Sequence, residues 1–159
     1  MKIQESLADD ITALVDKWEP VLRVLSPESI SVPRNAQNRS IRQIVGHMHD
    51  SASNNTHRIV HLQYQESPIS FPDYANLGNN DRWIAIQNYQ EEDWKDLLAL
   101  WTAAHRHLAH VIRQINPEKL DAVWESALEE EVSLKEMITD FPRHFRLHMS
   151  EIEGLMKTN

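Results

Sequence analysis

Apolar residues recur at helical spacing in four long stretches of the chain. These stretches cover residues 3–25, 41–65, 92–115 and 133–156. Within each stretch the apolar positions lie three or four residues apart, so their side chains share one face of an α-helix. The pattern therefore predicts four amphipathic helices and an all-α fold, for which an antiparallel four-helix bundle is the natural architecture.

Short polar signals mark where two of these helices begin. Ser40 with Gln43, and Ser133 with Glu136, have the spacing of a capping box, in which the two residues satisfy each other's backbone N–H groups. Pro142 lies inside the fourth predicted helix and should bend it, because proline removes a backbone donor.

The segments between the helices differ in length. Residues 66–92 contain Pro68, Pro72 and Gly78 together with many apolar side chains. We therefore expect a long connection between the second and third helices that packs across the bundle, with a short helix near residues 81–88. Residues 26–38 and 116–132 are predicted to be loops, the second of them packed.

The second helix also carries a polar row beside its apolar stripe. The row consists of His47, Ser51, Asn54, Arg58 and His61, which follow one another at helical spacing. Such a row is either the solvated edge of the helix or the lining of a polar pocket inside the bundle. In a pocket, Ser51, Asn54 and Arg58 are the candidates to bind a polar or anionic substrate.

Two histidines of the fourth helix, His144 and His148, stand one turn apart in or beside the apolar face. Such a pair binds one metal ion when a third ligand arrives from another helix. The alternative is a pair of core histidines that are hydrogen-bonded to their neighbours. Asp140, one turn before His144, is placed to orient an imidazole by accepting a hydrogen bond.

Periodicity leaves the third ligand open. With Met48 at the centre of the apolar stripe, His47 and His49 lie about 100° to either side of it. His57 points away from the stripe, which weakens it as a member of a rival histidine pair. His105 lies at the edge of the stripe on the third helix and is a minor candidate.

Composition and charge exclude several classes of function. A chain of 159 residues fits a single domain spanning residues 1–159. The net charge of −8 without a basic cluster disfavours nucleic-acid binding. The absence of cysteine excludes disulfides and thiolate ligands and fits a cytoplasmic protein. No apolar run reaches the roughly 18 residues that a membrane span needs, so we expect no membrane association.

With the helices placed, nearly the whole chain resembles the DinB-like/YfiT-like superfamily of metal-binding four-helix bundles. The resemblance rests on S-I-R-Q-I-V-G-H at residues 40–47 and on the D-F-P-R-H-F-R-L-H run at residues 140–148. They are similar to the family's W-S-x-x-E-I-x-x-H-L and H-x-x-x-H motifs. Arg39 stands where the first motif has Trp, and Gln43 where it has Glu.

The resemblance implies metal ligands at His47, His144 and His148. Three imidazoles with an open position are typical of a catalytic site for Zn²⁺, Ni²⁺ or Fe²⁺. The family implies a metal-dependent enzyme, either a transferase acting with a low-molecular-weight thiol or a hydrolase of a small-molecule substrate, and a homodimer. The alternative is a non-catalytic helical bundle that binds a partner or dimerises and has histidines in its core.

Overall fold

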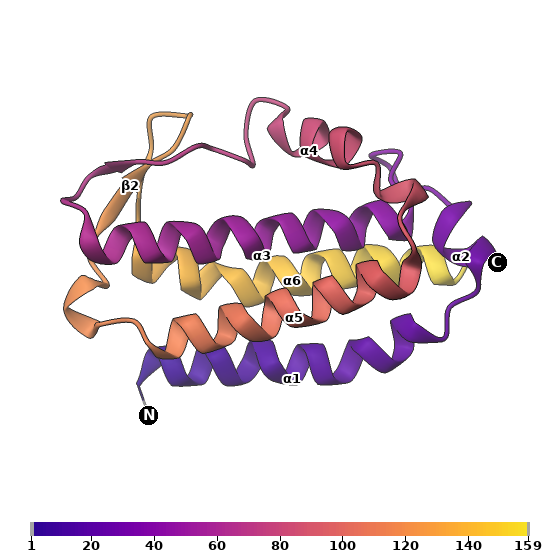
Figure 1. Ribbon diagram of the computed structural model, residues 1–159, viewed down its shortest axis with the longest axis horizontal. Helices are drawn as coiled ribbons and strands as arrows, with labels where there is room; N and C mark the ends of the chain where they lie inside the picture. The colour runs from indigo at the N-terminus through magenta and orange to yellow at the C-terminus, as the bar shows by residue number, and fades with distance from the viewer. Residues whose placement is uncertain (1, 159) are drawn as a thin grey trace.

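The computed structural model describes residues 2–158, and most of them are helical. Four long helices lie side by side (Figure 1): α1 (Ile3–Arg23), α3 (Ile41–Tyr64), α5 (Trp94–Arg113) and α6 (Leu134–Met156). Helix α1 contacts α5 and α6, and α3 contacts the same two helices. The four helices therefore enclose one apolar core, and the predicted mainly helical fold class is confirmed.

The ends of the long helices follow local sequence signals. Both predicted capping boxes are present: Ser40 accepts a hydrogen bond from the backbone N–H of Gln43, and Ser133 accepts one from that of Glu136. Pro142 lies inside α6 as predicted. The apolar stripe of α3 is completely buried, since its members are at most 1 % exposed: Ile41, Val45, Met48, Ala52, Ile59 and Leu62.

The segment between α3 and α5 runs along the outer side of α3 (Figure 1). It contains β1 (Ile69–Ser70), α4 (Asn79–Gln87) and the 3-10 helix η1 (Tyr89–Glu91). The predicted short helix is thus present, but it begins two residues earlier than expected. The segment brings Tyr74 and Tyr89, both buried, against α3.

The helix within residues 26–38 and the strands of a small sheet were not predicted from the sequence. Residues 27–31 form the helix α2 (Pro27–Ser31), which begins at the side chain of Ser26. Residues 116–132 contain the 3-10 helix η2 (Pro117–Lys119), the strand β2 (Val123–Glu125) and the start of β3 (Glu131–Ser133). Strand β2 pairs in parallel with β1 and antiparallel with β3. Strands of two or three residues are too short to show an alternating pattern.

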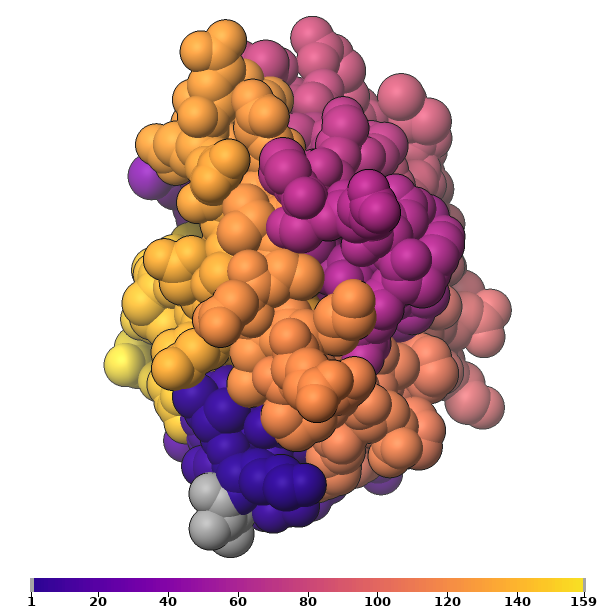
Figure 2. Space-filling model, turned by 90° about the vertical axis from the view of Figure 1, so that its left-hand side faces the viewer, coloured from indigo at the N-terminus to yellow at the C-terminus, as the bar shows by residue number. Residues whose placement is uncertain are grey.

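Figure 2 shows the end of the molecule where this small sheet forms. The segment that follows α3, in magenta, lies beside the segment 117–133, in orange, with the start of α1 below them. The sheet therefore joins the two connections that flank α5. Within the part of the chain that the structure describes, no helix has the length and apolar character needed to cross a bilayer.

Helices α3 and η1 approach each other most closely at Gly46. A Cβ atom added at Gly46 would lie 2.1 Å from Cδ2 of the Tyr89 ring. The Tyr89 hydroxyl donates a 2.5 Å hydrogen bond to the buried carboxylate of Asp50. The close packing of Tyr89 therefore requires glycine at position 46 of α3.

Candidate metal centre

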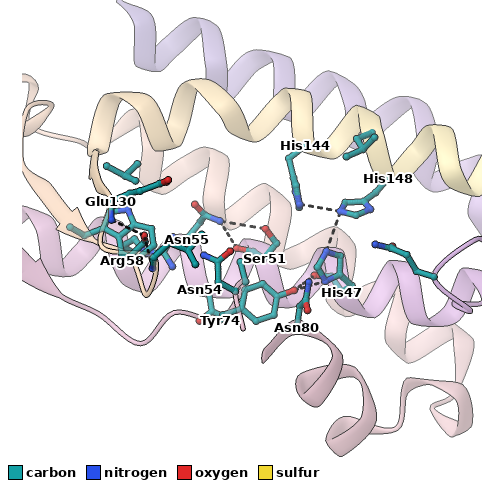
Figure 3. A pocket seen from close by; sticks show the side chains of 18 of the residues that line it. His47, Ser51, Asn54, Asn55, Arg58, Tyr74, Asn80, Glu130, His144 and His148 are labelled. Atoms are coloured by element: carbon teal, nitrogen blue, oxygen red, sulfur yellow. Dashed lines mark hydrogen bonds between the residues drawn. The ribbon is translucent and has the colours of Figure 1, made fainter. Parts of the chain in front are cut away.

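Three histidines converge between α3 and α6, as Figure 3 shows. Nε2 of His148 lies 3.1 Å from Nε2 of His47 and 3.0 Å from Nε2 of His144. All three nitrogens lie within 4.8 Å of one another. His47 and His148 are buried and His144 is partly buried. The structure thus brings together the three histidines named from the sequence, with His47 rather than His49 facing α6.

The hydrogen bonds of His47 define its tautomer. The Tyr74 hydroxyl lies 2.6 Å from Nδ1 of His47 and 3.0 Å from the backbone carbonyl oxygen of the same residue. The hydroxyl has a single proton, and it donates this proton to the carbonyl oxygen. The contact with Nδ1 can then be a hydrogen bond only if the Nδ1–H group of His47 donates to the Tyr74 oxygen. Nε2 of His47 then carries a lone pair.

His148 has the same tautomer for a different reason. Its Nδ1 lies 3.2 Å from Oε2 of Glu151. Burial disfavours the ionised form of Glu151, but the hydrogen bond to His148 and the positive charges of His148 and Arg39 outweigh it, so the pKa of Glu151 is lowered. An ionised carboxylate only accepts hydrogen bonds, so Nδ1 of His148 carries a proton, and when the imidazole is neutral its Nε2 carries the lone pair.

The lone pair of His47 Nε2 faces Nε2 of His148 across 3.1 Å, so a cation belongs between them, either a proton on His148 or a metal ion that both imidazoles bind. Burial lowers the pKa of His47 to about 2 and that of His144 to about 4, so these two imidazoles are neutral at neutral pH and free to bind a metal ion. Two nitrogen ligands of one ion lie about 2.9–3.4 Å apart when each bond is about 2.0–2.1 Å long. The distances from His148 to the other two imidazoles lie in this range, so they fit a shared divalent metal ion.

The groups that orient the imidazoles differ from the sequence prediction. Asp140 forms hydrogen bonds of 2.6 and 3.0 Å with Arg143 and acts on His144 only through its charge. The imidazole Nδ1–H groups donate to Tyr74 and Glu151 instead. Glu151 lies three residues after His148 on the same helix, and this spacing is a signal that sequence reasoning had available.

A pocket of about 400 Å³ extends from the three histidines along α3. Ser51, Asn54 and Arg58 are at most 7 % exposed and line this pocket, so the polar row of α3 is a pocket wall from His47 to Arg58, and only its last member, His61, lies outside the pocket. In Figure 3 Tyr74 lies beside His47, while Arg58 lies at the other end of the pocket. The pocket also includes Glu130 and Trp124, which precede α6.

The other histidine candidates lie outside this cluster. His57 is exposed, as predicted. His105 is completely buried and its Nδ1 contacts the carbonyl oxygen of Trp101 at 2.7 Å. Burial lowers the pKa of His105 to about 4, so this residue is a neutral core histidine at neutral pH.

Solved structures of other proteins share the fold of this chain. The chain is similar in structure to YfiT from Bacillus subtilis, described as a probable metal-dependent hydrolase with an unusual four-helix bundle topology. The TM-score is 0.84 at 17 % identity, over 99 % of this chain and 89 % of YfiT. A mycothiol-dependent maleylpyruvate isomerase matches with a TM-score of 0.76 at 11 % identity, over 95 % of this chain but only 61 % of the isomerase.

Sequence comparisons give a family but no individual relative. No curated protein matches the chain. The sequence model of the DinB superfamily matches residues 11–152, a stretch that includes His47, His144 and His148. The chain therefore belongs to the DinB superfamily.

Proposed function

We propose that this protein is an antiparallel four-helix bundle that binds one divalent metal ion through His47, His144 and His148 and acts as a metal-dependent enzyme on a small molecule. The observation that carries the proposal is the convergence of three imidazoles from two helices, with Nε2 of His148 lying 3.1 Å from that of His47 and 3.0 Å from that of His144. Zn²⁺, Ni²⁺ and Fe²⁺ all accept imidazole ligands. The predicted single domain, homodimer and cytoplasmic location stay predictions.

The proposed chemistry is transfer to or from a low-molecular-weight thiol, or hydrolysis. The likeness to YfiT and to the mycothiol-dependent isomerase supports this range of reactions. A bound divalent ion would supply Lewis acidity to activate a thiol or a water molecule. Ser51, Asn54 and Arg58 would bind and orient the substrate, while the buried pocket wall keeps bulk water away from the histidines.

Metal analysis tests the proposal directly. Protein purified without an affinity tag is expected to contain about one equivalent of a divalent metal, because three neutral imidazoles bind such ions tightly. After chelation and reloading, conjugation of cysteine to a model electrophile should require the loaded protein. A preparation that is free of metal and cannot be reloaded contradicts the proposal and favours the non-catalytic bundle.

Replacing Tyr74 with phenylalanine is expected to weaken metal binding by about 10- to 100-fold, because the hydrogen bond that fixes the tautomer and orientation of His47 is lost. The measurement is competition with a chromogenic chelator. Tyr64→Phe is the matched control, since the exposed Tyr64 hydroxyl contacts His61 and not the three histidines. Equal metal affinity in Tyr74→Phe and the wild type would show that Tyr74 has no orienting role.

A further inference from the structure

Arg58 is a buried cation that has no carboxylate partner within residues 2–158. The residue is only 6 % exposed. The one hydrogen bond that its guanidinium forms with the described residues runs from Nη1 to the sulfur of Met137, at 3.5 Å. Its Nε is buried and has no hydrogen-bond partner among the described residues. Thioether sulfur is a weak acceptor, and buried charges are normally paired. The guanidinium therefore has donors to spare inside the pocket.

Asp73 and Glu130 do not neutralise this charge. Asp73 raises the pKa of Arg58 through its field, but its oxygens accept hydrogen bonds from the backbone of Ala75, Asn76 and Ala127. Glu130 is exposed, and it forms no ion pair with Arg58 within residues 2–158. Burial lowers the pKa of Arg58 only to about 10, so the side chain stays charged at neutral pH.

Two aromatic rings fix the guanidinium in place. Its carbon lies 3.7 Å from the centroid of the Trp124 ring and 5.2 Å from that of Phe71. Aromatic rings bind the flat face of a guanidinium and leave the N–H groups at its edge free. A guanidinium held in this way is organised for two parallel hydrogen bonds to a carboxylate or a phosphate.

The position of Arg58 defines what else such a ligand would contact. Arg58 follows His47 by eleven residues, which is three helical turns, so the two residues share one face of α3 with Cα atoms about 16 Å apart. Ser51, Asn54 and Asn55 lie between them on the pocket wall (Figure 3). A ligand that contacts both ends of the pocket must therefore be elongated and must carry polar groups along its length.

We propose that the pocket binds an elongated small molecule whose anionic group, a carboxylate or a phosphate, is held by Arg58 while its reacting end lies at the three histidines. The placement of the reacting end at the histidines rests on the proposed function. The anion site is independent of it and depends only on Arg58, Trp124 and the pocket wall. The rival explanation is that Arg58 serves only as a structural contact between α3 and the small sheet.

Anion titration of metal-stripped protein separates these explanations. Inorganic phosphate and acetate are added separately, and the arginine side-chain Nε–H signals are followed by ¹⁵N NMR. The Arg58 signal, identified by its absence in Arg58→Lys, is expected to shift saturably with at least one anion. The anion with the higher affinity identifies the chemical group. No saturable shift of this signal with either anion overturns the proposal.

A second readout compares variants. The anion affinity is measured from the shifts of the Trp124 indole N–H and the Asn54 backbone N–H signals. In Arg58→Lys this affinity is expected to fall at least about tenfold, because lysine keeps the charge but loses the paired donors. Arg42→Lys is the matched control, a partly buried arginine on the same helix that bonds Ser31 and lies outside the pocket. Equal anion affinities of Arg58→Lys and the wild type would overturn the proposal. Metal content, measured on the same samples, tests the proposed function separately.

Discussion

His148→Ala is expected to lose its metal completely, falling from about one equivalent to a level below detection. His148 is the central member of the cluster, since its Nε2 lies close to both of the other imidazoles. Its removal leaves His47 and His144, one on each helix, and two imidazoles are a much weaker site than three. Elemental analysis of tag-free protein measures the loss. Metal retained at the wild-type level would rule out His148 as a ligand.

Thermal unfolding gives an independent measure of the same change. A metal that binds only the folded chain at about 100 times its dissociation constant stabilises it by about 2.7 kcal/mol. Added metal should therefore raise the melting temperature of the wild type and leave that of His148→Ala unchanged. His110→Ala is the matched control, because His110 is an exposed histidine of α5 outside the cluster and should behave as the wild type.

Gly46→Ala is expected to destabilise the fold by about 3 kcal/mol, although alanine is the better helix former. Helix propensity favours alanine by about 1 kcal/mol. Against this, the new methyl group would lie 2.1 Å from Cδ2 of Tyr89. Tyr89 is only 2 % exposed and donates to Asp50, so its ring cannot move away without losing burial and a hydrogen bond. Truncating a buried aromatic side chain to alanine costs about 3–5 kcal/mol, and pushing the Tyr89 ring out of its packed position loses contacts of the same kind, which exceeds the propensity gain.

Gly154→Ala is the matched control for this experiment. Gly154 also lies inside a long helix, α6, but a Cβ atom added there meets no atom within 4 Å. The substitution should therefore stabilise the protein by about 0.5–1 kcal/mol. Urea denaturation of the two variants measures both effects. A Gly46→Ala variant as stable as the wild type would mean that η1 does not pack against α3 as described.

The long helices could be predicted because their signals are local. The capping boxes at Ser40 and Ser133 and the apolar stripes lie within the segments they define. The same holds for His148, because it sits on a helix whose buried face the sequence reveals. Spacing could not choose between His47 and His49, since both flank the stripe symmetrically. The choice depends on where α6 packs.

What the sequence did not predict depends on contacts between distant segments. Tyr74 lies in a connection without periodicity, and its contact with His47 depends on the path of that connection over α3. The strands β1 and β2 are short and are stabilised by each other. Asp140 had the right spacing to reach an imidazole, but Arg143, three residues later, is a stronger partner for its carboxylate.

The small sheet has a consequence for how this pocket can diversify. The three histidines lie on long helices, whereas Trp124 lies on β2 and Tyr74 in the connection between β1 and α4. Substitutions in these connections can reshape the pocket at both of its ends while the helix–helix core stays intact. Within a lineage of such chains, ligand preference can therefore drift while the three histidines remain under constraint.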